Sequence, residues 1–164
     1  MKRLLAIPCL LALTAGPAFA LSCARPTIEG SYLEHSQAKE HYILVFGYLT
    51  NKRNVVIGPE REGFVGTGGR SENFTATFIG HQGTRAGFDR PIKATVAIST
   101  TCADAWCGSV AMDAMLMTFL ETTPYGHRMT IGPCSGSEFY TPTNDEKRSM
   151  LRCLRGGVCN PDRR

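Results

Sequence analysis

Residues 41–50, HYILVFGYLT, give the clearest strand signal in the chain. They are rich in aromatic and β-branched side chains, which fit the pleated surface of a sheet. Asn51, which follows directly, is a turn-forming residue. The sequence therefore predicts a strand that runs from His41 to Thr50.

Several shorter stretches on the C-terminal side have the same character. We predict further strands at residues 74–79, 91–100, 115–121 and 129–131. Apolar and polar residues alternate in the second of these stretches, so one set of side chains is expected to face the core: Ile92, Ala94, Val96 and Ile98. Five or six short antiparallel strands in a chain of this size are typical of a small closed barrel or a sandwich.

Helices are predicted near both ends of the chain. Ser31 with Glu34, and Thr143 with Glu146, have the spacing of a capping box, in which two side chains satisfy free backbone N–H groups at a helix start. Each pair is expected to begin a short helix. The second helix is expected to end at Gly156, because glycine commonly follows the last helical residue.

The first twenty residues have the pattern of a cleaved secretory signal peptide. A short basic start precedes an apolar stretch, and residues 18–20 (Ala-Phe-Ala) form the small-x-small pattern that a signal peptidase recognises. Residues 20–22 (Ala-Leu-Ser) form a second small-x-small pattern, so cleavage after Ser22 is an alternative to cleavage after Ala20. The apolar stretch is too short, and too interrupted by proline and glycine, to span a bilayer. We expect residues 21–164 to be secreted into the periplasm without stable membrane insertion.

The chain contains seven cysteines, of which Cys9 lies in the leader. An even set of six behind an export signal is typical of a disulfide-stapled domain in an oxidising compartment. The residues alone leave the connectivity open. The six are Cys23, Cys102, Cys107, Cys134, Cys153 and Cys159. Residues 21–164 have the length of one domain with one core.

Composition and spacing argue against nucleic-acid binding and against catalysis. The leader carries two of the 18 basic residues and none of the 14 acidic ones, so the remaining chain has a net charge of +2. Basic residues are dense only between Lys147 and Arg164, without the interleaved aromatic side chains of a nucleic-acid surface. The four histidines are scattered, and neither a His-x-x-x-His pair nor a paired Cys-x-x-Cys is present. We expect no catalytic residues, no metal site and no cofactor.

Five short motifs resemble, in their order along the chain, those of the netrin-like family. They are residues 21–26 (Leu-Ser-Cys-Ala-Arg-Pro), 78–80 (Phe-Ile-Gly), 107–108 (Cys-Gly), 117–120 (Met-Thr-Phe-Leu) and 130–134 (Thr-Ile-Gly-Pro-Cys). The best-known members of this family are the tissue inhibitors of metalloproteinases, and it has bacterial exported relatives. The resemblance spans residues 21–155. It implies a mainly β protein, an OB-like closed barrel of five to six strands with short N- and C-terminal helices, stapled by disulfides.

The resemblance also implies a disulfide pattern. The family opens with Cys-x-Cys, and Leu21 stands here in place of the first cysteine, so Cys23 corresponds to the second. In the family that cysteine pairs with the late-strand cysteine, which is Cys134 here. Cys107 lacks its family partner and is expected to pair with the extra Cys102. The remaining pair is then Cys153 with Cys159.

The resemblance implies a protein-binding or inhibitor-type module rather than an enzyme, with an unknown protein partner in the envelope or outside the cell. The contact ridge of the family corresponds to the loop at residues 101–107 and to the N-terminal segment, whose partner-binding candidates are Leu21, Ser22, Ala24 and Arg25. Trp106 is the expected anchor, because large aromatic residues are common interface hot spots. The alternative for Trp106 is burial against a disulfide.

Inhibitors of the family chelate the zinc of a metalloproteinase with the amine and carbonyl of their terminal cysteine. Leu21 has both groups, but it lacks the disulfide that would hold them rigid. We therefore expect metalloproteinase inhibition, if the chain has it, to be weak.

A second hypothesis is an envelope protein for thiol redox chemistry or copper handling. Trp106 and Cys107 are similar to the start of a thioredoxin-type motif, but Val110 occupies the place of its second cysteine. Thioether sulfurs suit cuprous ion, and four methionines lie in this half of the chain: Met112, Met115, Met117 and Met129. The competing interpretation is packing, with Met115, Met117 and Phe119 on one strand face toward the interior.

Overall fold

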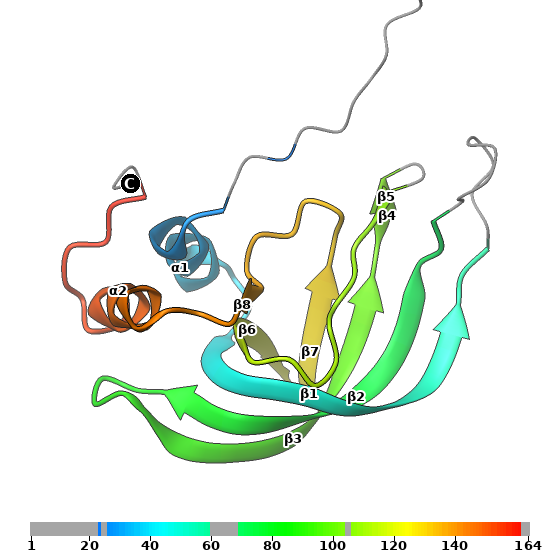
Figure 1. The fold of residues 1–164 in the computed structure, drawn as a ribbon, viewed down its shortest axis with the longest axis horizontal. Coiled ribbons are helices and arrows are strands. Elements are labelled where there is room, and N and C mark those ends of the chain that lie inside the picture. Colours follow the sequence, from blue (N-terminus) through cyan, green and yellow to red (C-terminus); the bar gives the residue numbers. More distant parts are fainter. Residues whose placement is uncertain (1–22, 24–25, 60–68, 104–105, 162–164) are drawn as a thin grey trace, which may run out of the picture.

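The computed structural model describes residues 23, 26–59, 69–103 and 106–161 (Figure 1). The chain is mainly β, with a helix near each end. Its elements are α1 (Ile28–Gln37), β1 (Tyr42–Ile57), β2 (Glu72–Gly83), β3 (Phe88–Thr100), β4 (Cys102–Ala103), β5 (Trp106–Cys107), β6 (Leu116–Thr123), β7 (Gly126–Ile131), β8 (Phe139–Tyr140) and α2 (Asn144–Leu154). No helix in the described ranges is both long enough and apolar enough to cross a membrane.

Six strands form one sheet in the order β1-β2-β3-β7-β6-β8, and β1 also pairs with β6. The pairing of β3 with β7 is parallel, and the other pairings in this sheet are antiparallel. Hydrogen-bonded neighbours therefore lead from β1 through β2, β3, β7 and β6 back to β1. The two-residue strands β4 and β5 form a separate small hairpin.

β1 is longer than predicted and changes character along its length. Residues 42–47 pair with β6 on one edge, whereas residues 51–57 pair only with β2 and are all exposed. Asn51 and Asn54 have positive φ angles of 60° and 54°, and the register with β2 shifts next to each of them. Such bulges twist a strand without ending it. The prediction that the strand ends before Asn51 is therefore wrong.

β2 likewise continues past Gly80, which is paired directly with Gly47 on β1. A Cβ on Gly47 would lie 2.6 Å from the Cα of Gly80 and 2.2 Å from the carbonyl oxygen of Ile79. The two strands can approach this closely only because neither residue has a side chain. Gly80 thus belongs to the interior of a strand, where it allows a close contact.

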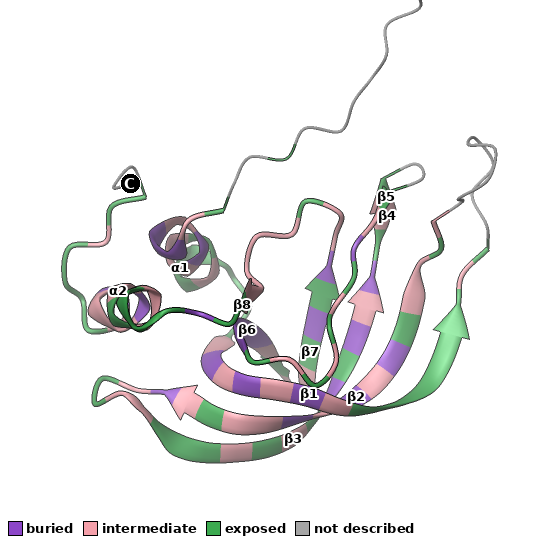
Figure 2. Cartoon of the chain, viewed as in Figure 1, coloured by how far each residue is buried: buried purple, intermediate pink, exposed green. Residues whose placement is uncertain are grey.

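Two clusters of buried side chains alternate along β1 and β6 and so lie on opposite faces of the sheet. Figure 2 marks the buried residues along these strands. The first cluster consists of Val45, Leu49, Phe74, Ala76, Phe78, Val96, Ile98, Leu116, Leu120, Met129 and Ile131. The second consists of Ile28, Leu44, Met117, Phe119 and Met150, with residues from both helices. The helices lie side by side over this second face, and Arg152 on α2 donates to the Glu29 carboxylate on α1 at 2.9 Å. The alternation predicted for residues 91–100 is confirmed, since Val96 and Ile98 are buried in the first cluster.

The prediction for the methionine face needs correction. Met115 precedes β6 and is 41% exposed, while Met117 and Phe119 are buried beneath the helices. Leu116 and Leu120, which alternate with them, face the first cluster. Alternation identified the residues that share a face, but the helices make both faces of this strand buried.

The two predicted helix starts have different outcomes. Thr143 and Glu146 make both halves of the capping box of α2. At α1 the N-cap is Thr27, whose hydroxyl accepts from the Gly30 N–H at 3.0 Å. Ser31 lies inside that helix, and its hydroxyl donates to the Gly136 carbonyl at 2.6 Å. The prediction of a capping box at Ser31 is therefore wrong.

Candidate functional site

The structure pairs the six cysteines as the family resemblance implied. Cys23 is bonded to Cys134, which lies 111 positions away, and their Cα atoms are 5.2 Å apart. Cys102 and Cys107 stand directly opposite each other in the β4–β5 hairpin and are also bonded. Cys153 and Cys159 close a short loop after α2. The first bond ends on the loop after β7 and the second lies in the β4–β5 hairpin, and Figure 1 shows this loop and the hairpin at the same end of the molecule.

We call this end the rim, and define it as Cys23, Pro26, the hairpin residues 101–103 and 106–108, and the loop 132–138. The loop holds the N-terminal segment at two points. One is the Cys23–Cys134 bond, and the other is a tight contact in which a Cβ on Gly136 would lie 2.6 Å from the Cβ of Pro26. The N-terminal segment is thereby fixed where it enters α1.

The same loop begins where the hairpin is anchored. The Thr101 N–H donates to the Ile131 carbonyl at 2.8 Å, and the Gly108 N–H donates to the Thr101 carbonyl at 2.9 Å. A Cβ on Gly108 would lie 2.2 Å from the Ile131 carbonyl oxygen, so the hairpin base sits directly against the end of β7. The structure therefore brings together the hairpin and the N-terminal segment, which the sequence prediction assigned to one site.

Trp106 is 62% exposed at the rim. The alternative of burial against a disulfide is therefore wrong for this residue. Its neighbour Cys107 is closed by the bond to Cys102, so the hairpin holds a large aromatic side chain in solvent on a short cross-linked support. The other predicted contact residues, Leu21, Ser22, Ala24 and Arg25, lie outside the described residues.

A polar cleft of about 560 Å³ adjoins the rim, and no pattern in the sequence predicted it. It lies between α1 and the loop 132–138, and contains His35, whose ring is stacked on Phe119 at 4.2 Å. The Nδ1 atom of His35 is 2.8 Å from the Ser31 carbonyl oxygen, which can only accept, so this nitrogen carries the proton. His35 and the loop are about a hundred positions apart, and no local pattern links them.

A smaller polar pocket next to this cleft contains Glu138. Burial raises the pKa of the Glu138 carboxyl, and hydrogen bonds from Ser135 at 2.9 Å and Ser137 at 3.4 Å oppose that rise. Burial also raises the pKa of the Tyr42 hydroxyl, and the negative charge of Glu121 acts in the same direction. The pocket can offer hydrogen bonds to a polar group. Within the described ranges, no group of three or more His, Cys, Asp or Glu side chains is placed to hold a metal ion.

The residues of the redox and copper hypothesis are not gathered into one site. Cys107 is bonded to Cys102. Met112 and Met129 pack with the first cluster, Met117 with the second, and Met115 is exposed. The methionines are thus divided between the two faces of the sheet.

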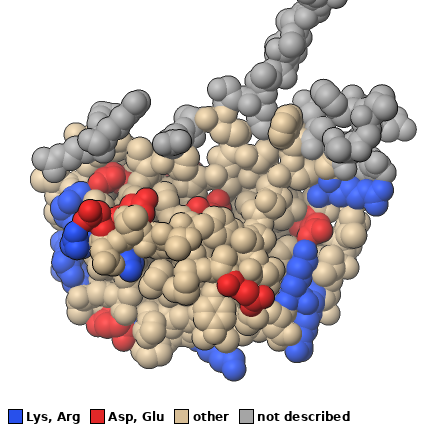
Figure 3. Space-filling view, viewed as in Figure 1, with Lys and Arg blue, Asp and Glu red and all other residues tan. Residues whose placement is uncertain are grey.

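Few charged side chains occur among the rim residues that the structure describes. Figure 3 shows lysine and arginine gathered toward the margins of the visible face, with mainly uncharged residues between them. Glu138 is the one charged residue among the described rim residues. Comparison with protein-family models, with curated proteins and with solved structures finds no match to this chain.

Proposed function

We propose that residues 21–164 form a secreted, periplasmic protein-binding module of netrin-like type, built on an OB-like closed barrel. A ring of five paired strands, β1, β2, β3, β7 and β6, supports the barrel. Six paired cysteines support an oxidising compartment. In this proposal the leader at residues 1–20 is removed, and the chain acts by binding and not by catalysis.

The exposed Trp106 on its cross-linked hairpin is the observation that carries the binding proposal. Tryptophan is the residue type most enriched among interface hot spots, and a rigid support lowers the entropy that is lost on binding. The disulfide at Cys23 holds a second segment at the same end. The described rim residues include no lysine or arginine, which favours a protein surface over a phosphate backbone as the partner.

Affinity capture tests this proposal. The oxidised chain 21–164 is immobilised and exposed to a periplasmic extract, and bound proteins are identified by mass spectrometry. Trp106→Ala should abolish capture of a specific partner. Tyr125→Ala is the matched control, because Tyr125 is 99% exposed in the β6–β7 turn, at the opposite end of β7 from the rim. Equal capture by wild type and by Trp106→Ala would contradict the proposed role of the rim.

Metalloproteinase inhibition is a narrower form of the same proposal. It requires a free amine at Leu21 beside the tethered Cys23. We expect weak inhibition, since Leu21 has no disulfide of its own. An inhibition assay on a chain that begins at Leu21 measures this, and nanomolar inhibition would contradict the expectation.

The competing proposal is an envelope redox or copper-handling protein that uses Cys102, Cys107 and the methionines. Its supporting observation is the short Cys102–Cys107 loop beside an exposed rim. Thiol titration of the native protein separates the two proposals. Six blocked cysteines support the stapled module, whereas a reactive Cys107, or a rise in unfolding temperature with cuprous ion, supports the rival.

A further inference from the structure

An apolar groove of about 570 Å³ crosses β1, β2 and β3 on the face of the sheet that points away from the first cluster. Strand register explains its shape. One wall is the row Phe46, His81 and Pro91, and the other is the row Tyr48, Ile79 and Lys93. The floor between them is the row Gly47, Gly80 and Ile92.

No side chain of the floor row points outward. Gly47 and Gly80 have none, and Ile92 turns its side chain toward the first cluster. Gly47 is nevertheless buried, because the wall side chains on either side of it are only two positions apart along the strand, or about 6.6 Å between Cα atoms. A ligand in this groove therefore rests on the apolar side chains of the walls. Met115 lies one strand beyond β1, and Lys93 lies at the β3 end. From Met115 to Lys93 there are three strand spacings, or about 14 Å.

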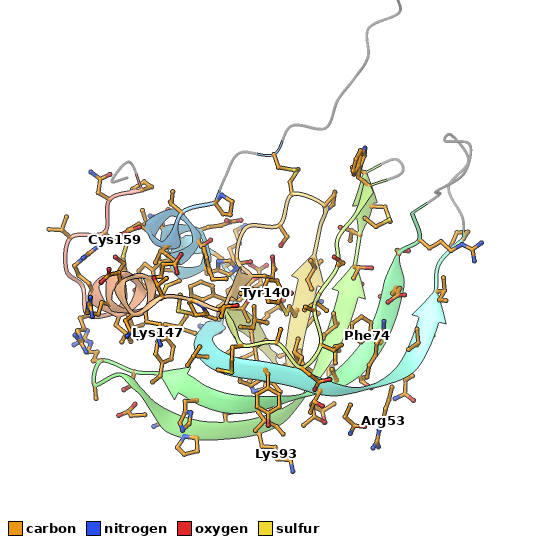
Figure 4. The ribbon with its side chains drawn as sticks, viewed as in Figure 1. Arg53, Phe74, Lys93, Tyr140, Lys147 and Cys159 are labelled. Carbon is orange, nitrogen blue, oxygen red and sulfur yellow. A yellow bond between two sulfur atoms is a disulfide. The ribbon has the colours of Figure 1, made fainter. Side chains whose placement is uncertain are left out.

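The charged side chains beside the groove are basic. Lys93 is exposed at the β3 end, and no ion pair of Lys93 occurs among the described residues. The Nζ atom of Lys147 lies 4.9 Å from the centre of the Phe46 ring in one wall. No aspartate or glutamate lines the groove. Figure 4 shows Lys93 projecting from the side of the molecule away from the β4–β5 hairpin. The groove therefore combines apolar walls with positive charge and no lining carboxylate.

We propose that this groove binds a monocarboxylate with an unbranched acyl chain of about the length of dodecanoate, the span of three strand spacings. The alkyl chain lies across the strands against the apolar side chains of the two walls, and the carboxylate pairs with the Lys93 ammonium. Burial of an apolar chain against apolar walls supplies the affinity, and the basic side chains beside the groove select an anionic head group. This site is separate from the rim and does not depend on the function proposed for it.

Calorimetric titration of the oxidised chain 21–164 with dodecanoate, below its micelle concentration, tests the site. Dodecyltrimethylammonium has the same tail and the opposite charge, and should bind about tenfold more weakly or not at all. Lys93→Glu should weaken dodecanoate binding by about five- to tenfold, because the attraction between the Lys93 ammonium and the ligand carboxylate is replaced by repulsion between two carboxylates. Lys39→Glu makes the same charge change outside the groove and should leave binding unchanged.

A second variant tests the apolar wall. Ile79→Thr keeps a β-branched side chain on β2 but makes the wall more polar, and should weaken binding by about threefold or more. Thermal unfolding checks that each variant is folded. Amide chemical shifts should move for residues 46–48, 79–81 and 92–93, and Trp106→Ala should leave dodecanoate binding unaltered.

Several results would overturn the proposal. These are equal affinity for the two head groups, equal behaviour of Lys93→Glu and Lys39→Glu, or chemical-shift changes centred elsewhere. Binding of a proline-rich peptide in the groove, together with no binding of dodecanoate, would assign this aromatic surface to a peptide instead.

Discussion

The rim and the first cluster are held together by different forces. The first cluster joins five strands through eleven buried side chains, most of them fully buried. At the rim, both Cys23 and Cys134 are exposed, and the segments are joined by disulfides, a few backbone hydrogen bonds and close glycine contacts. The comparison teaches that a surface with little apolar burial of its own can still be fixed when it is cross-linked to a packed sheet.

Removal of the long tether should have the largest effect on stability. In the chain-entropy model, Cys23→Ser with Cys134→Ser lowers the free energy of unfolding by about 5 kcal/mol, because the bond closes a long loop. The Cys102–Cys107 bond closes a much shorter loop, so Cys102→Ser with Cys107→Ser should lower the free energy of unfolding by about 2 kcal/mol. Urea unfolding at neutral pH measures both values. An equal or reversed order would mean that the rim does not depend on the tether.

The first cluster should respond strongly to a cavity. Leu49 is fully buried in it, so Leu49→Ala should lower the free energy of unfolding by about 3 kcal/mol. Val56, on the same strand, is 63% exposed, and Val56→Ala should change the free energy of unfolding by at most about 0.5 kcal/mol. Chemical denaturation of the two variants gives the comparison directly. Similar losses would show that the exposed part of β1 has packing partners of its own.

Close backbone contact at the rim should tolerate an added methyl group poorly. Gly108→Ala places a Cβ against the Ile131 carbonyl and should cost about 1–3 kcal/mol through overpacking. Gly132→Ala is the control, since its Cβ would meet only the Thr101 hydroxyl at 3.4 Å. Thermal unfolding of both variants, with capture of the Trp106-dependent partner as a second measurement, checks this expectation. A harmless Gly108→Ala would show that the hairpin base is not tightly held.

The smallest expected effect is a pH dependence at Glu138. Its folded-state pKa is raised by burial above the ordinary value of 4.5, so between these two values the folded state binds more protons than the unfolded state. This contribution to stability is complete below pH 4.5 and is lost as the pH rises through the folded-state pKa. Glu138→Gln removes it, so the variant should gain stability relative to wild type between pH 4 and pH 7. Urea unfolding across that range measures the difference, and a constant difference would refute the assignment.

Patterns of alternation and capping predicted the parts of the fold that depend on neighbouring residues. The buried face of residues 91–100 and the capping box at Thr143 were both predicted correctly. The errors at Ser31, Asn51 and Gly80 have a common cause. Each of these residue types is a local signal for a helix start or a strand end. Here the Ser31 hydroxyl bonds to a distant loop, and pairing between β1 and β2 continues past Asn51 and Gly80.

The candidate site was predictable in part. The family resemblance supplied the disulfide pairing and pointed to Trp106, but the exposure of Trp106 depends on what packs around the hairpin. The cleft at His35 and the groove over Gly47 and Gly80 gave no signal, because each combines residues from strands or loops that are far apart in the chain.

The sequence by itself determined the mainly β character, the helix near each end and the number of cysteines available for cross-linking. Those properties follow from side-chain type and short-range spacing. Only the tertiary structure decided that Met117 lies beneath the helices, that Gly47 faces Gly80, and that the hairpin and the tethered N-terminal segment are held by the end of β7 and the loop that follows it. Strand register and layer packing fix these contacts, and both depend on free energies summed over the whole sheet.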